Sequence, residues 1–290
     1  MLQAKKQNKK IGWSGAIVTI IVFVVFVVYS LCLLYPYFYG VQISFMESGR
    51  AFMRDTTHFP WPLNFENYLK AFDELKVNDA GYFMMLVNSL WYSVGSTVLG
   101  LFFSACTAYV ICNYDFFGRK FLYNMAIVIM MIPIYGSLPA TFKLYSDLQI
   151  INSPLYLISC VGGFGGTFIY AYAFFKSLSW SYAEAAFIDG ASHFKVFISI
   201  MLPMLIPSLT ALGIMSFIGC WNDYMTPLLY FGDMPTLASG LWTYERKIEY
   251  TANQPVYFAG VVMSLLPILT IFITCQNTIM GKIYMGGLKG

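Results

Sequence analysis

The amino-acid sequence predicts an all-α membrane protein with six transmembrane helices. The first observation is composition: 58% of the 290 residues are hydrophobic and only 11% are charged, whereas soluble domains carry about a quarter charged residues. The second is the spacing of the charges, because six uncharged stretches each exceed the roughly 20 residues that a spanning helix needs. These stretches are 11–46, 80–114, 121–142, 148–175, 196–222 and 250–281.

The distribution of Lys and Arg predicts that both termini are cytoplasmic. An even number of spans puts both termini on one side, and cytoplasmic loops carry an excess of Lys and Arg. With a cytoplasmic N-terminus, 10 of these cations lie in inner segments and 7 in outer segments. We therefore expect residues 1–12 to be a cytoplasmic N-terminus. The apolar run that follows is too long for the core of a cleaved signal peptide.

Each of the next segments has its own expected role. The outer loop at about 41–81 is the longest hydrophilic stretch and is expected to cap the membrane body. The second span is rich in Ser and Thr, which suit close helix packing or a polar path. The third span contains Pro133 and Pro139, which permit kinks. The fourth contains the G-x-x-x-G pair Gly162 and Gly166, which suits a close helix crossing.

A polar segment at about 177–203, between the fourth and fifth spans, carries the signals of a short helix. Ser181 and Glu184 have the S-x-x-E spacing of a capping box, so we expect the helix to begin at Ser181. Gly190 can adopt the left-handed conformation that ends a helix. Ser192 can then cap a second helix that enters span five, where two prolines bend it. This anatomy predicts docking to a partner, and an ordinary interhelix loop is the alternative.

The spacing within this segment resembles the EAA loop of ABC importer permeases. The positions that match this signature are Glu184, Ala185, Ala186, Gly190, Ile200, Leu202 and Pro203. Three other stretches resemble landmarks of the sugar-importing branch that contains the six-helix permease of the maltose transporter. They are Glu66-Asn67-Tyr68, Phe116 to Arg119, and Phe217 to Leu229. With the glycine-rich C-terminus, the resemblance extends from Glu66 to the last residue.

This resemblance implies the type I ABC importer permease fold. Residues 13–290 are then a single transmembrane permease domain with a coupling helix between spans four and five. The resemblance assigns docking on a cytoplasmic ATPase to Glu184, Ala185, Ala186, Asp189 and Gly190. It also implies that the C-terminal tail, at about 281–290, reaches the ATPase interface through Gly286, Gly287 and Lys289.

The same resemblance implies the other components of the system. The expected partners are a second permease subunit in a heterodimer, two copies of the ATPase subunit, and an extracellular or periplasmic sugar-binding protein. The chain is expected to cross the lipid bilayer of a bacterial cell membrane several times. The sequence has no phosphate-binding loop, so we expect no enzyme activity, cofactor or metal in this chain. ATP and Mg²⁺ are expected to be used by the partner ATPase. The sequence contains no block of basic residues interleaved with aromatic residues, so we expect no nucleic-acid partner.

Candidates for the sugar path lie mostly near the outer end of the fifth span. Sugar sites combine aromatic faces with amides or carboxylates in a mostly apolar cavity. The residues with this chemistry are Asn88, Trp221, Asn222, Asp223 and Tyr224. The alternative is an interfacial carboxylate within an aromatic belt, and in maltose-type systems the partner permease can carry most sugar contacts. A permease for a non-sugar solute stays an alternative, and a stand-alone secondary transporter is more distant because no second copy of the EAA region is found.

Overall fold

The computed structural model describes residues 13–132, 137–248 and 253–283, and every regular element in these ranges is helical. The prediction of an all-α protein is confirmed. In chain order the elements are α1 (Trp13–Ser44), α2 (Gly49–Arg54), α3 (Glu66–Glu74), α4 (Tyr82–Asn113), α5 (Arg119–Met131), α6 (Leu138–Asp147), the 3₁₀ helix η1 (Pro154–Cys160), α7 (Gly166–Ser177), α8 (Ser181–Ile188), α9 (His193–Val196), the π-helix η2 (Phe197–Met201), α10 (Leu202–Asn222), α11 (Met225–Tyr230), α12 (Leu237–Ile248) and α13 (Gln254–Ile283).

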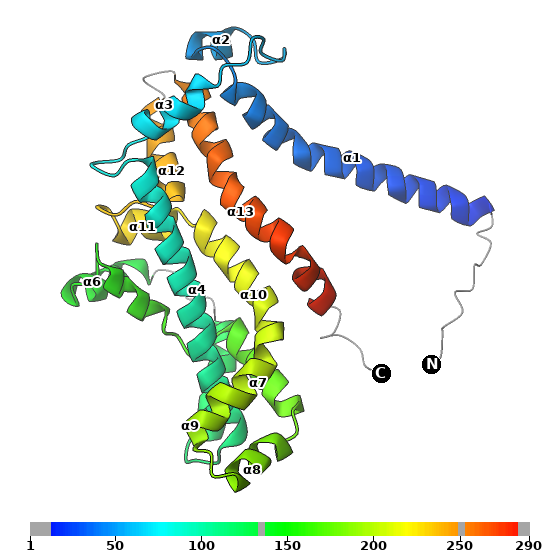
Figure 1. The fold of residues 1–290 in the computed structure, drawn as a ribbon, viewed down its shortest axis with the longest axis vertical. Helices are drawn as coiled ribbons and strands as arrows, with labels where there is room; N and C mark the ends of the chain where they lie inside the picture. The colour runs from blue at the N-terminus through cyan, green and yellow to red at the C-terminus, as the bar shows by residue number, and fades with distance from the viewer. Residues whose placement is uncertain (1–12, 133–136, 249–252, 284–290) are drawn as a thin grey trace.

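The elements form an elongated body with α4 and α10 at its centre (Figure 1). Helix α4 packs against α7, α10 and α12, and α10 also packs against α13. Helices α8 and α9 lie at one end of the body, called here the α8 end, and α2 and α3 lie at the opposite, α2 end. Separate apolar clusters fill these two ends, so the body has a distinct core beneath each of them.

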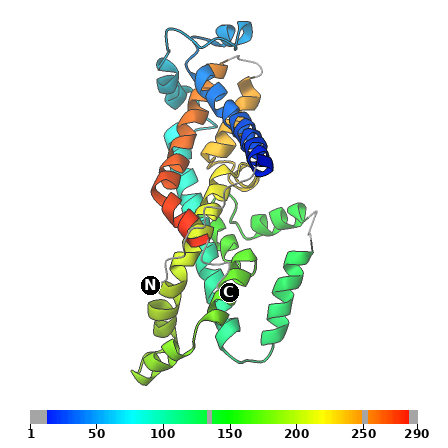
Figure 2. The ribbon, with the colours of Figure 1, turned by 90° about the vertical axis from the view of Figure 1, so that its right-hand side faces the viewer.

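Four helices in the described ranges are long and apolar enough to cross a membrane: Gly15–Ser44, Tyr82–Asn113, His193–Asn222 and Gln254–Gln276. The expectation of one long helix in each of the other two uncharged stretches is wrong. Between 121 and 142, α5 is followed by the separate helix α6, and Figure 2 shows both apart from the main column of helices. Pro139 lies in the first turn of α6, the position where a helix tolerates proline. Pro133 lies outside the described residues.

The second interrupted stretch, between 148 and 175, breaks at its glycines. Residues 161–165 are not helical, and Gly165 has a φ of +154°. The hydroxyl of Ser104 on α4 donates to the carbonyl of Gly162 at 3.3 Å. The predicted helix crossing at Gly162 and Gly166 is therefore wrong, because Gly162 precedes the helix. These glycines instead let a non-helical segment approach α4 closely.

Gly163 shows how close this approach is, and it gives a testable prediction. A Cβ atom at Gly163 would lie 2.5 Å from the Thr107 hydroxyl oxygen and 3.2 Å from two of its carbons. We expect Gly163→Ala to lower the unfolding free energy by about 1–3 kcal/mol, the usual cost of overpacking. Thermal unfolding of the detergent-solubilised chain measures this loss. Gly162→Ala is the matched control, because nothing lies within 4 Å of its added Cβ; equal loss from both variants would contradict the prediction.

Helix α1 is apolar all round and extends away from the body (Figure 1). None of its most apolar window is buried within the chain. It meets α13 near its C-terminal end, where a Cβ at Gly40 would contact the Phe258 ring at 3.4 Å. A helix with no polar face is stable where lipid or another apolar surface surrounds it. The segment is thus a single apolar helix of 32 residues.

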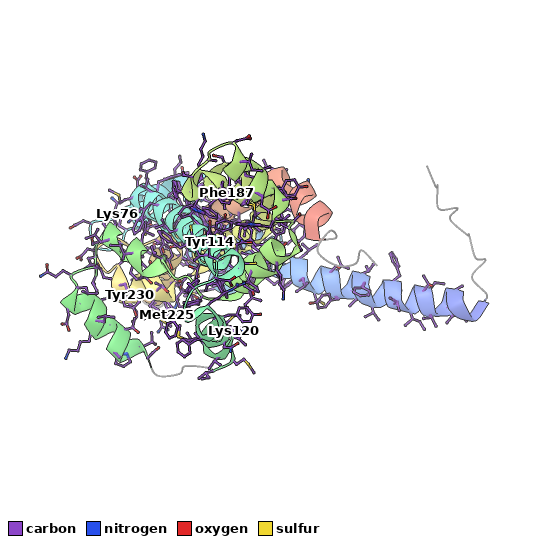
Figure 3. All side chains as sticks on the ribbon, turned by 90° about the horizontal axis from the view of Figure 1, so that it is seen from below. Lys76, Tyr114, Lys120, Phe187, Met225 and Tyr230 are labelled. Carbon is purple, nitrogen blue, oxygen red and sulfur yellow. The ribbon has the colours of Figure 1, made fainter. Side chains whose placement is uncertain are left out.

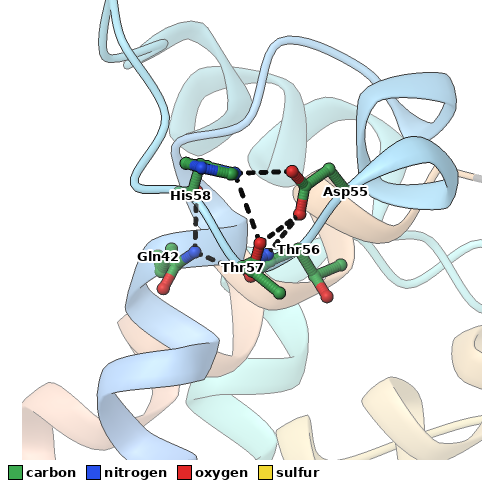
Figure 4. A network of polar contacts seen from close by, with 5 residues as sticks. All are labelled: Gln42, Asp55, Thr56, Thr57 and His58. Carbon is green, nitrogen blue, oxygen red and sulfur yellow. Dashed lines mark hydrogen bonds and ion pairs between the residues drawn. The ribbon is translucent and has the colours of Figure 1, made fainter.

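The loop after α2 is fixed to the end of α1 by a network of polar contacts (Figure 4). The Gln42 side-chain amide donates to the carbonyls of Thr56 and His58, each at 2.9 Å. The Asp55 carboxylate accepts from the hydroxyl of Thr57 at 2.6 Å and from its backbone N–H at 2.7 Å, and contacts His58 Nδ1 at 2.6 Å. Hydrogen bonds from Thr57, and then from His58, hold the pKa of Asp55 well below its usual range. The carboxylate is thus kept ionised and the loop ordered.

Asn67, in the stretch Glu66-Asn67-Tyr68, joins α3 to the end of α1. Its side-chain amide is buried and donates to the carbonyls of Ser44 at 2.8 Å and Met46 at 2.7 Å. The Ser44 carbonyl belongs to the last turn of α1 and the Met46 carbonyl follows it, so neither has a partner within the helix. The Tyr68 hydroxyl lies 2.7 Å from the Ser44 hydroxyl. Helix α3 therefore closes the C-terminal end of α1 at the α2 end of the body.

Candidate functional sites

The predicted docking segment folds into helix α8, and its boundaries match the expectation. The helix begins at Ser181, and Gly190 follows it with a φ of +79°. The N–H of Ala191 donates to the carbonyl of Ala186 at 2.9 Å, a 6→1 bond that closes the helix end around the left-handed glycine. The capping box is wrong: Ser181 is already helical, and its N–H is met by the Ser179 hydroxyl at 3.4 Å.

Helix α8 has one face turned to its own chain and one face open. Ala183 is 0% exposed and Ala186 is 8% exposed, and both belong to the apolar cluster at the α8 end. The exposed side chains are those of Ser181, Tyr182, Glu184, Ala185, Ile188 and Asp189. The structure thus divides the predicted docking residues: Glu184, Ala185, Asp189 and Gly190 are exposed, while the methyl group of Ala186 packs inward.

Aromatic rings hold the buried face of α8 against the end of α4. Tyr114 follows α4, and its ring packs edge-on against Trp180, with centroids 6.2 Å apart, and against His193 at 5.4 Å. Its hydroxyl lies 2.9 Å from His193 Nδ1. Phe187 of α8 packs against His193 at 4.7 Å and against Trp180 at 6.1 Å. Figure 3 shows Tyr114 and Phe187 in this region, seen from the α8 end. Displacing α8 must therefore move α4 and α9.

The connection from α8 to α10 is short and hydrogen-bonded. The Ser192 hydroxyl accepts from the N–H of Lys195 at 3.4 Å, so its predicted capping role is confirmed. The π-helix η2 follows, in which the N–H of Leu202 reaches the carbonyl of Phe197. Pro203 comes next and has no N–H to donate, and a π-bulge changes the hydrogen-bond register at such a position. The chain then continues as α10, so only the short turn at 189–192 separates α8 from the membrane-length helix His193–Asn222.

Two of the predicted sugar-path residues are buried with their polar groups occupied. The indole N–H of Trp221 donates to the carbonyl of Ser264 at 3.3 Å. The Asn88 side-chain amide donates to the carbonyl of Pro235 at 3.0 Å and accepts from the indole of Trp91 at 3.3 Å. Buried polar groups must be satisfied in this way. These contacts give Asn88 a structural role between α4 and the start of α12.

Asp223 forms two contacts within the chain. One carboxylate oxygen accepts from the hydroxyl of Tyr92 on α4 at 2.9 Å. The other accepts from the N–H of Thr226 at 3.1 Å, in the first turn of α11. Asn222 is exposed, and its amide donates to the carbonyl of Ile218 in its own helix at 2.9 Å. Asp223 therefore caps α11 and joins the end of α10 to α4.

Three of the candidates, Trp221, Asn222 and Tyr224, line a cavity of about 270 Å³ beside the C-terminal end of α10 and the N-terminal half of α13. Asn222 and Tyr224 contribute from one side, and Trp242 and Glu245 of α12 from another. The rings of Tyr224 and Trp242 are stacked, with centroids 5.9 Å apart and planes at 16°. The Arg246 guanidinium lies 4.2 Å from the Trp242 ring centroid. The cavity thus combines aromatic faces, an amide and a carboxylate.

Sequence reasoning missed Trp242 and Glu245. The available signal was their spacing, since residues three apart share one face of a helix. The predicted tail residues Gly286, Gly287 and Lys289 lie outside the described residues, so their contact with an ATPase stays a prediction.

Comparisons with known proteins agree with this architecture. Residues 96–276 match the family described as "Binding-protein-dependent transport system inner membrane component". The chain is 33% identical to the arabinooligosaccharides transport system permease protein AraQ of Halalkalibacterium halodurans, over 80% of this chain and 81% of that protein. It is 27% identical to the diacetylchitobiose uptake system permease protein NgcG of Streptomyces coelicolor, over 91% and 86% of the two chains.

A solved structure supports the fold. A chain from the crystal structure of a bacterial ABC transporter involved in the import of the acidic polysaccharide alginate superposes with a TM-score of 0.74. The match covers 91% of this chain and 97% of that chain, at 24% sequence identity. The fold is therefore that of an ABC importer permease. The protein belongs to the binding-protein-dependent transport system inner membrane component family.

Proposed function

We propose that this chain forms half of the pore of an ATP-driven sugar importer. The observation that carries the proposal is helix α8, which has one face built into the membrane body and one face open for a partner. Relatives named for arabinooligosaccharides, diacetylchitobiose and starch degradation products support a carbohydrate substrate. A non-sugar solute is the alternative that a substrate panel would reveal.

The partners follow from the proposed role. A second permease subunit completes the pore in a heterodimer, and an extracellular or periplasmic protein delivers the sugar. Two copies of a cytoplasmic ATPase subunit bind and hydrolyse ATP with Mg²⁺. When the ATPase dimer closes, α8 is drawn with it and transmits the movement to α4 and α10 through Tyr114 and η2. This chain itself performs no hydrolysis.

The proposed topology places α8 and both termini in the cytoplasm of a bacterial cell. The excess of Lys and Arg in the inner segments supports this orientation. We propose that α5 with α6, and η1 with α7, supply the two further crossings of one permease domain, residues 13–290. Non-helical backbone at membrane depth is tolerated where it is buried in protein or lines a cavity, and residues 161–165 pack against α4 in this way.

The docking role is tested on the exposed face of α8. We expect Ile188→Ala to reduce co-purification of the ATPase subunit by about tenfold, because an exposed anchor that fills a partner's pocket contributes more than 1 kcal/mol. Trp61→Ala is the matched control, since both side chains are 85% exposed but Trp61 lies in the loop after α2. Equal retention of the ATPase by both variants would reject docking through this face.

The sugar route is tested at Trp242. We expect Trp242→Ala to reduce the maximal rate of sugar uptake by about tenfold, because it removes the aromatic face beside Tyr224. The sugar concentration for half-maximal uptake is expected to change little, since the binding protein captures the sugar. Trp242→Phe keeps an aromatic face and should retain most of the rate. Normal maximal uptake in the alanine variant would exclude this cavity from the route.

A further inference from the structure

A second polar cavity lies where the end of α4, the start of α5 and the middle of α7 meet. Its volume is about 570 Å³. It belongs to the α8 end of the body and shares no residue with the cavity at Trp242. The polar side chains that line it are Asp115, Arg119, Lys120, Asn124, Tyr123 and Tyr172. The proposed docking and sugar-path roles use none of them.

The charge around this cavity is only partly balanced. Arg119 forms an ion pair with Asp115 and donates to the carbonyl of Cys112 at 2.7 Å. Lys120 is exposed, and its ammonium group has no acceptor among the described residues. Both cations lie in the first turn of α5, where the positive end of the helix dipole disfavours them. One carboxylate thus faces two cations and a helix N-terminus, so an anion is favoured here.

The neutral side chains of the cavity add hydrogen-bond donors. The rings of Tyr123 and Tyr172 pack together with centroids 4.6 Å apart. Neither of their hydroxyls has a hydrogen-bond partner within the described part of the chain, and neither does the Asn124 amide. An ammonium group, two hydroxyls and an amide in one cavity are suited to an oxyanion with several acceptor oxygens, such as phosphate.

Exposed aromatic side chains place this cavity at the surface of a membrane. Helix α4, one of the four membrane-length helices, ends at Asn113, and the exposed rings of Phe116, Phe117 and Phe121 follow directly. Aromatic residues concentrate at the boundary between lipid tails and water. Figure 2 shows α5 apart from the main column, and Figure 3 shows Lys120 near the edge of the body. We therefore expect the donors of the cavity at the depth of lipid headgroups.

We propose that this cavity binds the phosphate group of an anionic phospholipid. Basic pockets between membrane helices on the cytoplasmic side suit such headgroups, and the proposed topology puts the α8 end on that side. The Phe116, Phe117 and Phe121 rings would contact the acyl chains while Lys120 and the two tyrosine hydroxyls hold the phosphate. A lipid bound here would fill the space between α5 and the body and fix α5 beside α4.

Native mass spectrometry of the full chain in detergent tests this site. We expect phosphatidylglycerol to be retained in preference to phosphatidylcholine. Lys120→Gln should weaken retention about fivefold, the contribution of one basic residue near an anionic lipid surface. Tyr172→Phe should also weaken it several-fold by removing one hydrogen bond to the phosphate, although it changes no charge and keeps the ring. Lys195→Gln, which removes an exposed lysine outside the cavity, should leave retention unchanged.

Three results would overturn the proposal. The first is equal retention of the two lipids by the unaltered chain. The second is an equal effect of Lys120→Gln and Lys195→Gln with no effect of Tyr172→Phe, which would indicate general electrostatic attraction. The third is displacement of phosphatidylglycerol by inorganic phosphate at equal concentration, which would indicate a site for the free ion. The measurement needs no ATPase or sugar, so it can fail while the transport role stands.

Discussion

Replacing Ala186 with leucine is expected to abolish sugar uptake and to lower the thermal stability of the purified chain. The Ala186 methyl group is buried in the apolar cluster between α8 and the membrane body, and in a close-packed interior three more carbon atoms must displace their neighbours. Overpacking of this kind costs about 1–3 kcal/mol. Since α8 has only eight residues and a single buried face, this cost is enough to displace it from Trp180 and His193. Uptake of radiolabelled sugar and thermal unfolding in detergent measure the two effects.

Ala185→Leu is the matched variant for this prediction. The same three carbon atoms are added one residue away, but Ala185 is exposed. We expect the Ala185 variant to keep its thermal stability and to lose ATPase association, whereas the Ala186 variant loses stability as well. Normal uptake in a well-expressed Ala186 variant would contradict the force-transmitting role of α8. Equal destabilisation by both variants would contradict the assignment of its two faces.

The C-terminal end of α8 and the start of α9 could be predicted because their signals are local. Gly190 and Ser192 act within a few residues of their own position, and the structure confirms both roles. The buried face could not be predicted in the same way. It is set by Tyr114, about seventy residues earlier in the chain, whose ring and hydroxyl meet Trp180 and His193 only after folding. The resemblance to the EAA loop therefore located the element without showing that Ala186 packs inward.

The number of uncharged stretches predicted the membrane class but not the continuity of the helices. The length of an uncharged stretch shows how many apolar residues are available to cross a membrane. It does not show whether the backbone hydrogen bonds of a helix continue through the whole stretch. At 161–165 the close contact of Gly163 with Thr107 favours a non-helical segment over a continuous helix. Such a contact joins residues more than fifty positions apart, so neither apolar length nor the G-x-x-x-G spacing reveals it.

The sugar-path candidates show the same limit. The structure buries Asn88 between α4 and the segment before α12, whereas Trp221, Asn222 and Tyr224 line the cavity beside α12. The stacking partner Trp242 comes from α12, a helix that the charge pattern did not predict. Amide, carboxylate and aromatic groups serve equally well for packing and for sugar binding. Only their hydrogen-bond partners separate the two uses.

Asp223→Ala is expected to cause a large loss of stability, because both oxygens of the Asp223 carboxylate accept hydrogen bonds within the chain. The substitution removes the acceptor that caps α11, which contributes about 1 kcal/mol. It also leaves the buried hydroxyl of Tyr92 without its partner, which costs about a further 1–3 kcal/mol. Thermal unfolding of the purified chain should show a clear decrease in midpoint temperature. Asn222→Ala is the neighbouring control, because that exposed side chain bonds only within its own helix.

Asp223→Asn then separates a structural carboxylate from one that contacts sugar. Asparagine keeps a carbonyl oxygen that can accept from the Tyr92 hydroxyl or from the Thr226 N–H, so a structural role predicts recovery of most of the lost stability and of uptake. A direct role of the charge in the sugar path predicts the reverse: a stable protein with little uptake. The contacts at 2.9 and 3.1 Å occupy both carboxylate oxygens, and this favours the structural outcome. A stable but inactive Asp223→Asn variant would contradict it and would place the charge itself in the path.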